Sequence, residues 1–357
     1  SLLHLTPYSI VRGGLLMRED RMKSGTDFVF PLSIASGDPS PNGVVIWTRI
    51  NPEAIEDHNQ PLHFELSRSR NFRDILYTGK IEGSALNADR DFTVAIDLAE
   101  QKEAHLEPFT SYYYRFIYRN VPSRTGHCKT LPTKDQNLDH LRIIPITCQD
   151  YSSGYYHAFD HIAQEADIDF VIHLGDFIYE YSRFPGIFNP RKIDLPSEVA
   201  LNLEDYRSTY RQYRQDPSLQ RAMENHTWII TSDDHETADN CFWDYDDDAL
   251  GLPLLHPLQS GSKNERNALK LASQRAWMEY IPARVKLNPN AQHPWEYLSI
   301  YRSFCFGKLA ELYMTDTRTY RSDTNGKRQA TMLGAEQKQW IISGMKTSQA
   351  QWQIWGN

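Results

Sequence analysis

Two short segments of the sequence concentrate groups that could bind metal ions, and the first surrounds Asp176. Asp176 follows an apolar stretch and Gly175, and Tyr179 comes three residues later. A carboxylate at the end of a rigid strand can bridge two cations, and a nearby phenol becomes a ligand for a hard trivalent ion once it is deprotonated. The alternative is a capping aspartate on a tight turn beside a packed tyrosine. The residue types leave both interpretations open.

The second segment, Asp233 to Glu236, places four ionisable groups directly after the apolar run Thr227 to Thr231. This concentration is unfavourable unless the groups bind a cation or neutralise one another. Asp234 is therefore a candidate metal ligand. His235 is a candidate proton donor to a leaving group, because a histidine beside metal charge titrates in a useful range. The alternative is a solvated acidic turn.

Other side chains become candidates only through their neighbours in the predicted fold. Cys148 could be a metal ligand or a nucleophile, although a lone cysteine is more often a small buried hydrophobe. Arg207 could bind a phosphoryl group with two hydrogen bonds, or could simply be an exposed helix arginine.

Two further charged segments are given no catalytic role. We expect Asp316 and Arg318 to form an ion pair beneath the site. We expect the acidic run 244–248 to be solvated, because it lacks the glycine and distal glutamate of an EF-hand.

The elements that would position these groups alternate between strand and helix. Polar residues follow each predicted strand, and in α/β sheets the loops at the carboxyl ends of strands converge on one site. We therefore expect a single shared polar site. Strands are predicted at 142–147, 168–174, 227–231, 309–315 and 351–355, and helices at 155–166, 204–213, 267–280 and 335–345.

The preceding part of the chain has a period-two pattern instead. Large apolar residues occupy every second position from Phe92 to Leu98, and other β-branched and aromatic runs are separated by turn residues. This pattern predicts a β-sandwich of immunoglobulin or fibronectin-III size. The predicted organisation is an N-terminal extension over 1–29, the β-sandwich over 30–132 and an α/β (α+β) domain over 140–357.

The composition excludes several classes of function. The 357 residues include 38 Lys and Arg against 46 Asp and Glu, which gives a formal charge of -8 and argues against nucleic acid as a partner. No apolar run approaches the roughly 20 residues that span a bilayer. The four cysteines are far apart and form no CxxC pair, so neither a disulfide scaffold nor a zinc ribbon is indicated. The oligomeric state stays open.

Several segments, in the right order along the chain, resemble the motifs of the PhoD-type alkaline phosphatases and phosphodiesterases of the metallophosphoesterase superfamily. This resemblance implies a β-sandwich followed by a catalytic domain made of two packed β-sheets flanked by helices. It runs from about Phe30 to Asn357. The segments that carry it are Phe30–Arg49, Thr147–Gln149, His173–Glu180, Asp205–Arg207, Asp233–Glu236, Asp316–Arg321 and Met332–Gln337.

The resemblance also implies an activity and cofactors. Members of the family hydrolyse phosphate monoesters and diesters, in some cases phospholipids, are commonly exported, and hold a ferric ion (Fe3+) together with calcium (Ca2+). Carried over by motif, the iron ligands would be Cys148, Asp176 and Tyr179. Asp176 would bridge to calcium, which Asp234 would also bind. The family continues past the last strand to a Gly-Asp-x-His element with a further histidine ligand, so we expect this chain to lack its C-terminal part.

The expected reaction is in-line attack of a metal-bound hydroxide on a small phosphate ester or a phospholipid. His235 and Arg207 would face the phosphoryl group, where His235 assists the leaving oxygen and Arg207 adds charge-assisted hydrogen bonds. Three alternatives stay open. They are a phospholipase D-like phosphodiesterase of the same family, a thiol hydrolase with Cys148 as nucleophile and His235 as base, and a non-catalytic binding protein with an incomplete metal site.

Overall fold

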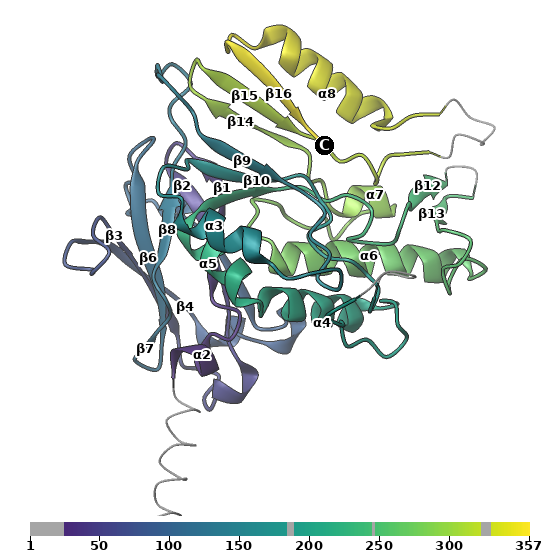
Figure 1. Cartoon of the computed structure of the whole chain (residues 1–357), viewed down its shortest axis with the longest axis horizontal. Coiled ribbons are helices and arrows are strands. Elements are labelled where there is room, and N and C mark those ends of the chain that lie inside the picture. Colours follow the sequence, from purple (N-terminus) through teal and green to yellow (C-terminus); the bar gives the residue numbers. More distant parts are fainter. Residues whose placement is uncertain (1–24, 184–188, 245–246, 323–329) are drawn as a thin grey trace, which may run out of the picture.

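The computed structural model describes residues 25–183, 189–244, 247–322 and 330–357 (Figure 1). Residues 1–24 of the predicted N-terminal extension lie outside this range. The last residues of that extension form the short helix α2 (Thr26–Val29), and Val29 is buried in the core of the β-rich N-terminal region. The extension therefore ends as part of the packed structure.

Two layers of strands form the N-terminal region. One layer contains β3 (Leu62–Ser67), β4 (Ile75–Ile81), β6 (Ser111–Tyr118), β7 (Val121–Pro122) and β8 (Gly126–Lys129), and the other contains β1 (Ile34–Ser40), β2 (Gly43–Arg49) and β5 (Thr93–Asp97). Alternate residues of β6, from Tyr112 to Tyr118, are buried against residues of β1 and β2 such as Ile34 and Ile46. The all-β character predicted from the period-two pattern is confirmed.

The N-terminal strands share a sheet with the α/β region. The order of this six-stranded sheet is β5-β2-β1-β11-β10-β9, in which β1 pairs in parallel with β11 (Thr227–Ile230). Gly37 suits this approach, because a Cβ there would lie 2.8 Å from the carbonyl oxygen of its β11 partner Trp228 and 2.3 Å from that of Pro282. The sequence analysis described residues 30–132 and 140–357 as separate domains and did not foresee this shared sheet. The period of a strand shows which face is buried but does not identify its neighbour.

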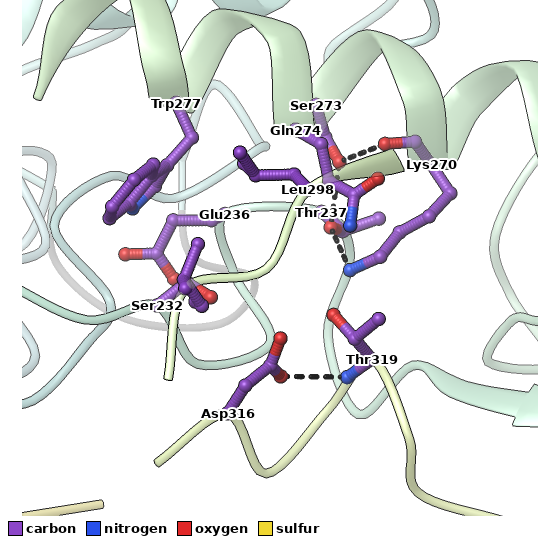
Figure 2. A pocket seen from close by; sticks show the side chains of 11 residues that line it. Ser232, Glu236, Thr237, Lys270, Ser273, Gln274, Trp277, Leu298, Asp316 and Thr319 are labelled. Carbon is purple, nitrogen blue, oxygen red and sulfur yellow. Dashed lines mark hydrogen bonds between the residues drawn. The ribbon is translucent and has the colours of Figure 1, made fainter. Parts of the chain in front are cut away.

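The remaining strands of this sheet are β9 (Ile143–Ile146) and β10 (Phe170–His173), both parallel to β11. One face of the sheet packs on helices, and its core joins Trp47 of β2 and Trp228 of β11 to Tyr210 and Trp277. Helix α6 (Lys263–Tyr280) passes beside the loop that follows β11, and residues of this helix face that loop (Figure 2). The helices of this region are α3 (His157–Gln164), α4 (Leu203–Arg214), α5 (Pro217–Asn225) and α6 (Lys263–Tyr280).

A second sheet packs on the other face of the first. It has the order β14-β15-β16, and Phe306 and Leu312 share a core with Phe170 and Ile229 of the first sheet. Its strands are β14 (Arg302–Phe306), β15 (Ala310–Met314) and β16 (Trp352–Gly356), accompanied by α8 (Gly334–Thr347). The remaining short elements of the described chain are α7 (Pro294–Tyr297), β12 (Phe242–Asp244), β13 (Ala249–Gly251) and four 3-10 helices, η1 (Pro52–Ala54), η2 (Gly83–Ala85), η3 (Ala88–Arg90) and η4 (Leu98–Glu100). None of its helices has the length and hydropathy to cross a bilayer.

Candidate metal centre

The candidate centre lies at the edge where β9, β10 and β11 end. Cys148, Asp176 and Asp234 follow these three strands. Cys148 and Asp176 both adopt left-handed backbone conformations, with φ of 56° and 57°. Such conformations are uncommon for residues other than glycine and are found where the surrounding structure imposes them. Here the Cys148 N–H donates to the carbonyl oxygen of Gly175 at 3.2 Å, which ties the two strand ends together.

The candidate ligands gather around Asp176. Ligand atoms of Asp176, Asp234 and His235, all buried, lie within 4.8 Å of one another. Cys148 Sγ is 3.4 Å and the Tyr179 hydroxyl 3.3 Å from the same Asp176 Oδ2. Five of the six predicted site residues therefore meet at one point, although they span almost ninety positions of the sequence. This buried Asp and His group could hold a metal ion.

The electrostatics of the centre disfavour negative charge in the absence of a cation. Burial raises the pKa of Asp176 to about 6; His235 opposes this, whereas the neighbouring charges of Asp234 and Asp233 add to it. Burial likewise raises the pKa of Cys148 and that of Tyr179, and Asp176 raises both further. Groups that repel one another in this way become compatible when they share a cation.

His235 is held in a fixed orientation at the edge of this group. Its Nδ1 lies 2.8 Å from Glu180 Oε2, its ring stacks on that of Tyr179 with centroids 4.1 Å apart, and its Nε2 is 3.8 Å from Asp239 Oδ1. Burial lowers the pKa of His235, but Glu180 and the nearby aspartates outweigh burial and raise it to about 9. The sequence analysis missed Glu180, although it lies in the same motif as Asp176 and Tyr179.

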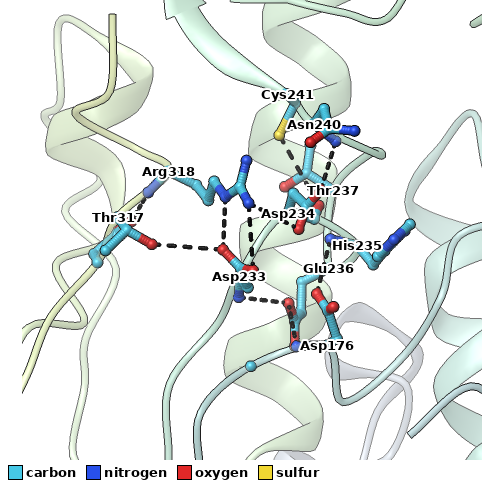
Figure 3. A network of polar contacts seen from close by, with 12 residues as sticks. Asp176, Asp233, Asp234, His235, Glu236, Thr237, Asn240, Cys241, Thr317 and Arg318 are labelled. Atoms are coloured by element: carbon cyan, nitrogen blue, oxygen red, sulfur yellow. Dashed lines mark hydrogen bonds and ion pairs between the residues drawn. The ribbon is translucent and has the colours of Figure 1, made fainter. Parts of the chain in front are cut away.

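The Asp233–Glu236 loop is not a solvated turn. Glu236 is buried and accepts the backbone N–H groups of Asp176, Phe177 and Asp233 at 3.2, 2.7 and 2.8 Å (Figure 3). Its carboxylate therefore fastens this loop to the loop after β10. Gly175 is needed at this junction, because it has φ of 111° and a Cβ there would lie 2.5 Å from Asp233 N.

Arg318 neutralises part of the acidic loop. Its Nε lies 2.6 Å from Asp233 Oδ1 and its Nη2 lies 3.3 Å from Asp234 Oδ1 (Figure 3). The expected side-chain ion pair between Asp316 and Arg318 is wrong, since Asp316 Oδ1 instead accepts the backbone N–H groups of Arg318 and Thr319 at 3.0 and 2.8 Å. The turn that Asp316 stabilises thus directs Arg318 towards the acidic loop.

The structure corrects the role predicted for Arg207. Its Nε and Nη2 each donate to Glu279 of α6 at 2.7 Å, and Nη2 also donates to the carbonyl oxygen of Asp89 in the N-terminal region at 2.5 Å. The guanidinium is therefore engaged in joining α4, α6 and the N-terminal region, and the prediction that it faces a phosphoryl group is wrong. The helix position was predicted correctly, but the partner depends on a buried carboxylate that is 72 positions away.

The acidic run 244–248 makes surface contacts where it is described. Tyr245 and Asp246 lie outside the described residues. Asp248 pairs with Lys263, and Asp247 Oδ2 lies 3.3 Å from Arg266 Nη2. Both aspartates lie on the surface beside the first turns of α6, in agreement with the interpretation as a charged surface segment.

Comparison with known proteins identifies the family. Residues 143–357 match the PhoD-like phosphatases, and residues 17–132 match the N-terminal domain of the same family. Alkaline phosphatase D of Bacillus subtilis (strain 168) is 31% identical over 356 positions, which cover 92% of this chain and 55% of that protein. A solved structure described as "Structure of PhoD" is 30% identical with a TM-score of 0.78, covering 93% of this chain and 62% of that one.

The chain thus spans little more than half the length of the curated relative that it matches. The family match nevertheless includes both halves of this chain, and the structural match includes the shared arrangement of an all-β N-terminal region and a mixed α/β region. With a family match over more than half of its residues, this chain belongs to the PhoD-like phosphatase family.

Proposed function

We propose that this protein hydrolyses phosphate esters with the aid of metal ions held by Cys148, Asp176, Tyr179 and Asp234. The observation that carries this proposal is the convergence of these side chains, together with His235, around Asp176. The family name and the name of the Bacillus subtilis relative support a phosphatase. Monoesters, diesters and phospholipids all remain within the proposed substrate class.

The donor set fits the proposed pair of Fe3+ and Ca2+. A thiolate and a phenolate that both reach the same carboxylate suit a trivalent iron, and the carboxylates of Asp176 and Asp234 suit calcium. Like-charged carboxylates that lie close together in a buried site also need a cation for balance. When bound, such ions supply positive charge against the phosphoryl oxygens and acidify a water molecule.

The protein's own residues orient the proton donor. Glu180 binds Nδ1 of His235 and Tyr179 stacks on its ring, so Nε2 is the nitrogen left to give a proton to the leaving oxygen. Arg318 serves a different purpose, because it balances Asp233 and Asp234. The role of phosphoryl-binding cation, first assigned to Arg207, falls to the metal ions in this proposal.

The thiol hydrolase alternative is less well supported by the geometry. Cys148 Sγ interacts with the Thr147 hydroxyl at 3.3 Å and with Asp176, and a nearby carboxylate disfavours the nucleophilic thiolate. The two mechanisms respond oppositely to reagents. Our proposal predicts that a chelator abolishes the activity, whereas a thiol enzyme would keep its activity in chelator and lose it to an alkylating agent.

The proposal is tested by Asp176→Asn in the full-length protein loaded with iron and calcium. We expect hydrolysis of both a phosphomonoester and a phosphodiester to fall by more than about 100-fold, the upper range for loss of a group that only supports a ligand. Asp139→Asn, at an exposed position, is the matched control. An Asp176→Asn enzyme with normal turnover would refute the proposed centre.

Spectroscopy gives a test that does not depend on the substrate. A phenolate bound to Fe3+ produces a visible absorption band, which we expect in the iron-loaded protein and expect to disappear in Tyr179→Phe. Tyr181→Phe is the matched control, because the Tyr181 ring lies 5.5 Å from that of Tyr179 in the same segment. A band that survives Tyr179→Phe but not Tyr181→Phe would move the ligand assignment to Tyr181.

We further propose export of the protein, supported by the family resemblance. Fractionation of the source cells with an antibody against this chain would test the proposal. Recovery outside the cytoplasmic fraction is the expected result, and recovery only with cytoplasmic markers would contradict it.

A further inference from the structure

A small polar cavity lies between α6 and the loops that carry the candidate centre (Figure 2). The space in which the centre of a water molecule can lie without a clash is about 20 Å³. Its walls come from α6, from the loop after β11 and from the turn after β15, together with Leu298 and Ile300. All the lining side chains except Ser232 are buried, so the cavity belongs to the interior of the molecule.

Three polar atoms in the walls lack a hydrogen-bond partner. They are Trp277 Nε1, Gln274 Oε1 and Asp316 Oδ2, which have no partner among the described residues. The three residues are only 2%, 7% and 1% exposed. Buried polar atoms in native proteins are nearly always paired, either with protein groups or with ordered water. Three unpaired atoms around one cavity therefore indicate that it has an occupant.

Lys270 adds a fourth polar group that is incompletely paired. Its side chain is buried, and within the described part of the chain Nζ makes one hydrogen bond, to Thr237 Oγ1 at 3.3 Å, and no ion pair. An ammonium group has three N–H donors. Lys270 and Asp316 thus bring opposite charges to the same cavity without touching each other, an arrangement that is costly unless something polar lies between them.

We propose that this cavity binds ordered water, which hydrogen-bonds to unpaired polar atoms of its walls. The chemistry of the walls selects this occupant, because Lys270 and Trp277 donate hydrogen bonds whereas Gln274 and Asp316 accept them. A cation would be repelled by the Lys270 ammonium, and an anion by the Asp316 carboxylate. Water donates and accepts, and the open volume exceeds the roughly 10–15 Å³ that one molecule requires.

The position of this cavity has a structural consequence for the candidate centre. Glu236, which fastens the acidic loop, and Thr237, which bonds to Ser273 Oγ at 2.8 Å, both line the cavity. Asp316 stabilises the turn that directs Arg318 to Asp233. Water in the cavity would therefore lie where α6 meets both of the loops that support the candidate centre.

Nuclear magnetic resonance of the full chain labelled with ¹⁵N-tryptophan tests this proposal directly. We expect a rotating-frame Overhauser cross-peak between water and the Trp277 indole proton, assigned with Trp277→Phe. Trp47 is the internal control, because its buried indole donates to the carbonyl oxygen of Glu279 at 2.8 Å and should show no such peak. A resolved Trp277 signal without a water cross-peak would overturn the proposal.

A high-resolution crystal structure provides a second, independent measurement. We expect water oxygens within hydrogen-bond distance of Trp277 Nε1 and Asp316 Oδ2, and we expect Lys270→Met to weaken or remove their density. Lys338→Met, at an exposed position, should leave the density unchanged. A direct Lys270–Asp316 ion pair, an empty cavity or a metal ion in it would each contradict the proposal.

Discussion

Two buried clusters of charged residues in this protein differ in how their charge is balanced. Where α4 and α6 meet the N-terminal region, Asp91 is bound by Arg49 at 2.8 Å and Arg211 at 2.7 Å, and Arg207 is bound by Glu279. At the candidate centre, the ion pairs that five acids make within the described part of the chain involve two basic side chains, Arg318 and His235; the acids are Asp176, Glu180, Asp233, Asp234 and Glu236. The first cluster is satisfied within the protein and holds elements together, whereas the second has an excess of acid that suits a cation.

The largest expected effect comes from breaking the balanced cluster. Arg207→Met should lower the free energy of unfolding by about 3–5 kcal/mol, because it leaves the Glu279 carboxylate buried without its main partner. Denaturant titration measures this loss. The KM of the fraction that remains folded should stay unchanged, and a large rise in KM with intact stability would restore Arg207 to the substrate site.

The acid-rich cluster should respond in the opposite way, by gaining stability from an added ligand. Calcium alone, at about 100 times its dissociation constant, should raise the free energy of unfolding by about 2.7 kcal/mol. Thermal unfolding with and without chelator measures the gain. Asp234→Asn should reduce the gain and Asp139→Asn should preserve it, whereas an equal gain in all three proteins would show that the ions bind elsewhere.

The acid-rich cluster also depends on an unusual backbone conformation at Gly175. Gly175→Ala should cost about 1–3 kcal/mol, because alanine is strained at φ of 111° and its Cβ would collide with Asp233 N. The damage should centre on the acid-rich cluster, so metal binding should weaken more than the fold. Calorimetric titration with metal, compared with the unfolding free energy, measures the two effects. Tight metal binding by Gly175→Ala would show that this junction is not needed.

The smallest effect is a pH dependence of the balanced cluster. Burial disfavours the Asp91 carboxylate, but the hydrogen bond and charge of Arg49 outweigh burial and hold the pKa of Asp91 below its usual value. Its contribution to stability is therefore complete above the unfolded pKa of about 3.9 and is lost as the pH falls through the lower, folded pKa. In Asp91→Asn, the free energy of unfolding should therefore fall less steeply as the pH is lowered through this range. An unchanged dependence on pH would rule out Asp91 as its source.

The sequence predicted much of the α/β region because its strands and helices have strong, separate periodicities. Strand β11, for example, lies within one residue of its predicted bounds. Polar residues after β9, β10 and β11 correctly indicated where the candidate ligands meet, but those after β15 and β16 are not among these ligands. The strand β14 and the helix α5 were missed. Each is short and adjoins another element, so its pattern merges with that of its neighbour.

The partners of individual side chains could not be predicted in the same way. Arg207 lies on its predicted helix, but its binding to Glu279 depends on how α4 and α6 pack. The left-handed backbone at Cys148 is likewise imposed by contacts between two strand ends and has no local signature in the sequence. Local patterns therefore located the ligand candidates, whereas tertiary packing determined which groups support them.

The pairing of β1 with β11 also limits how this protein can be divided. A fragment that began at residue 140 would expose the edge of β11 along Thr227 and Trp228, where β1 now supplies the neighbouring strand. Unprotected strand edges promote association between molecules. We expect such a fragment to aggregate when expressed alone and to regain solubility when residues 25–132 are supplied in the same cell. The two halves would then depend on each other for solubility and would have to be kept together in evolution. Gene fusions that exchange only one of them should fail to give soluble protein.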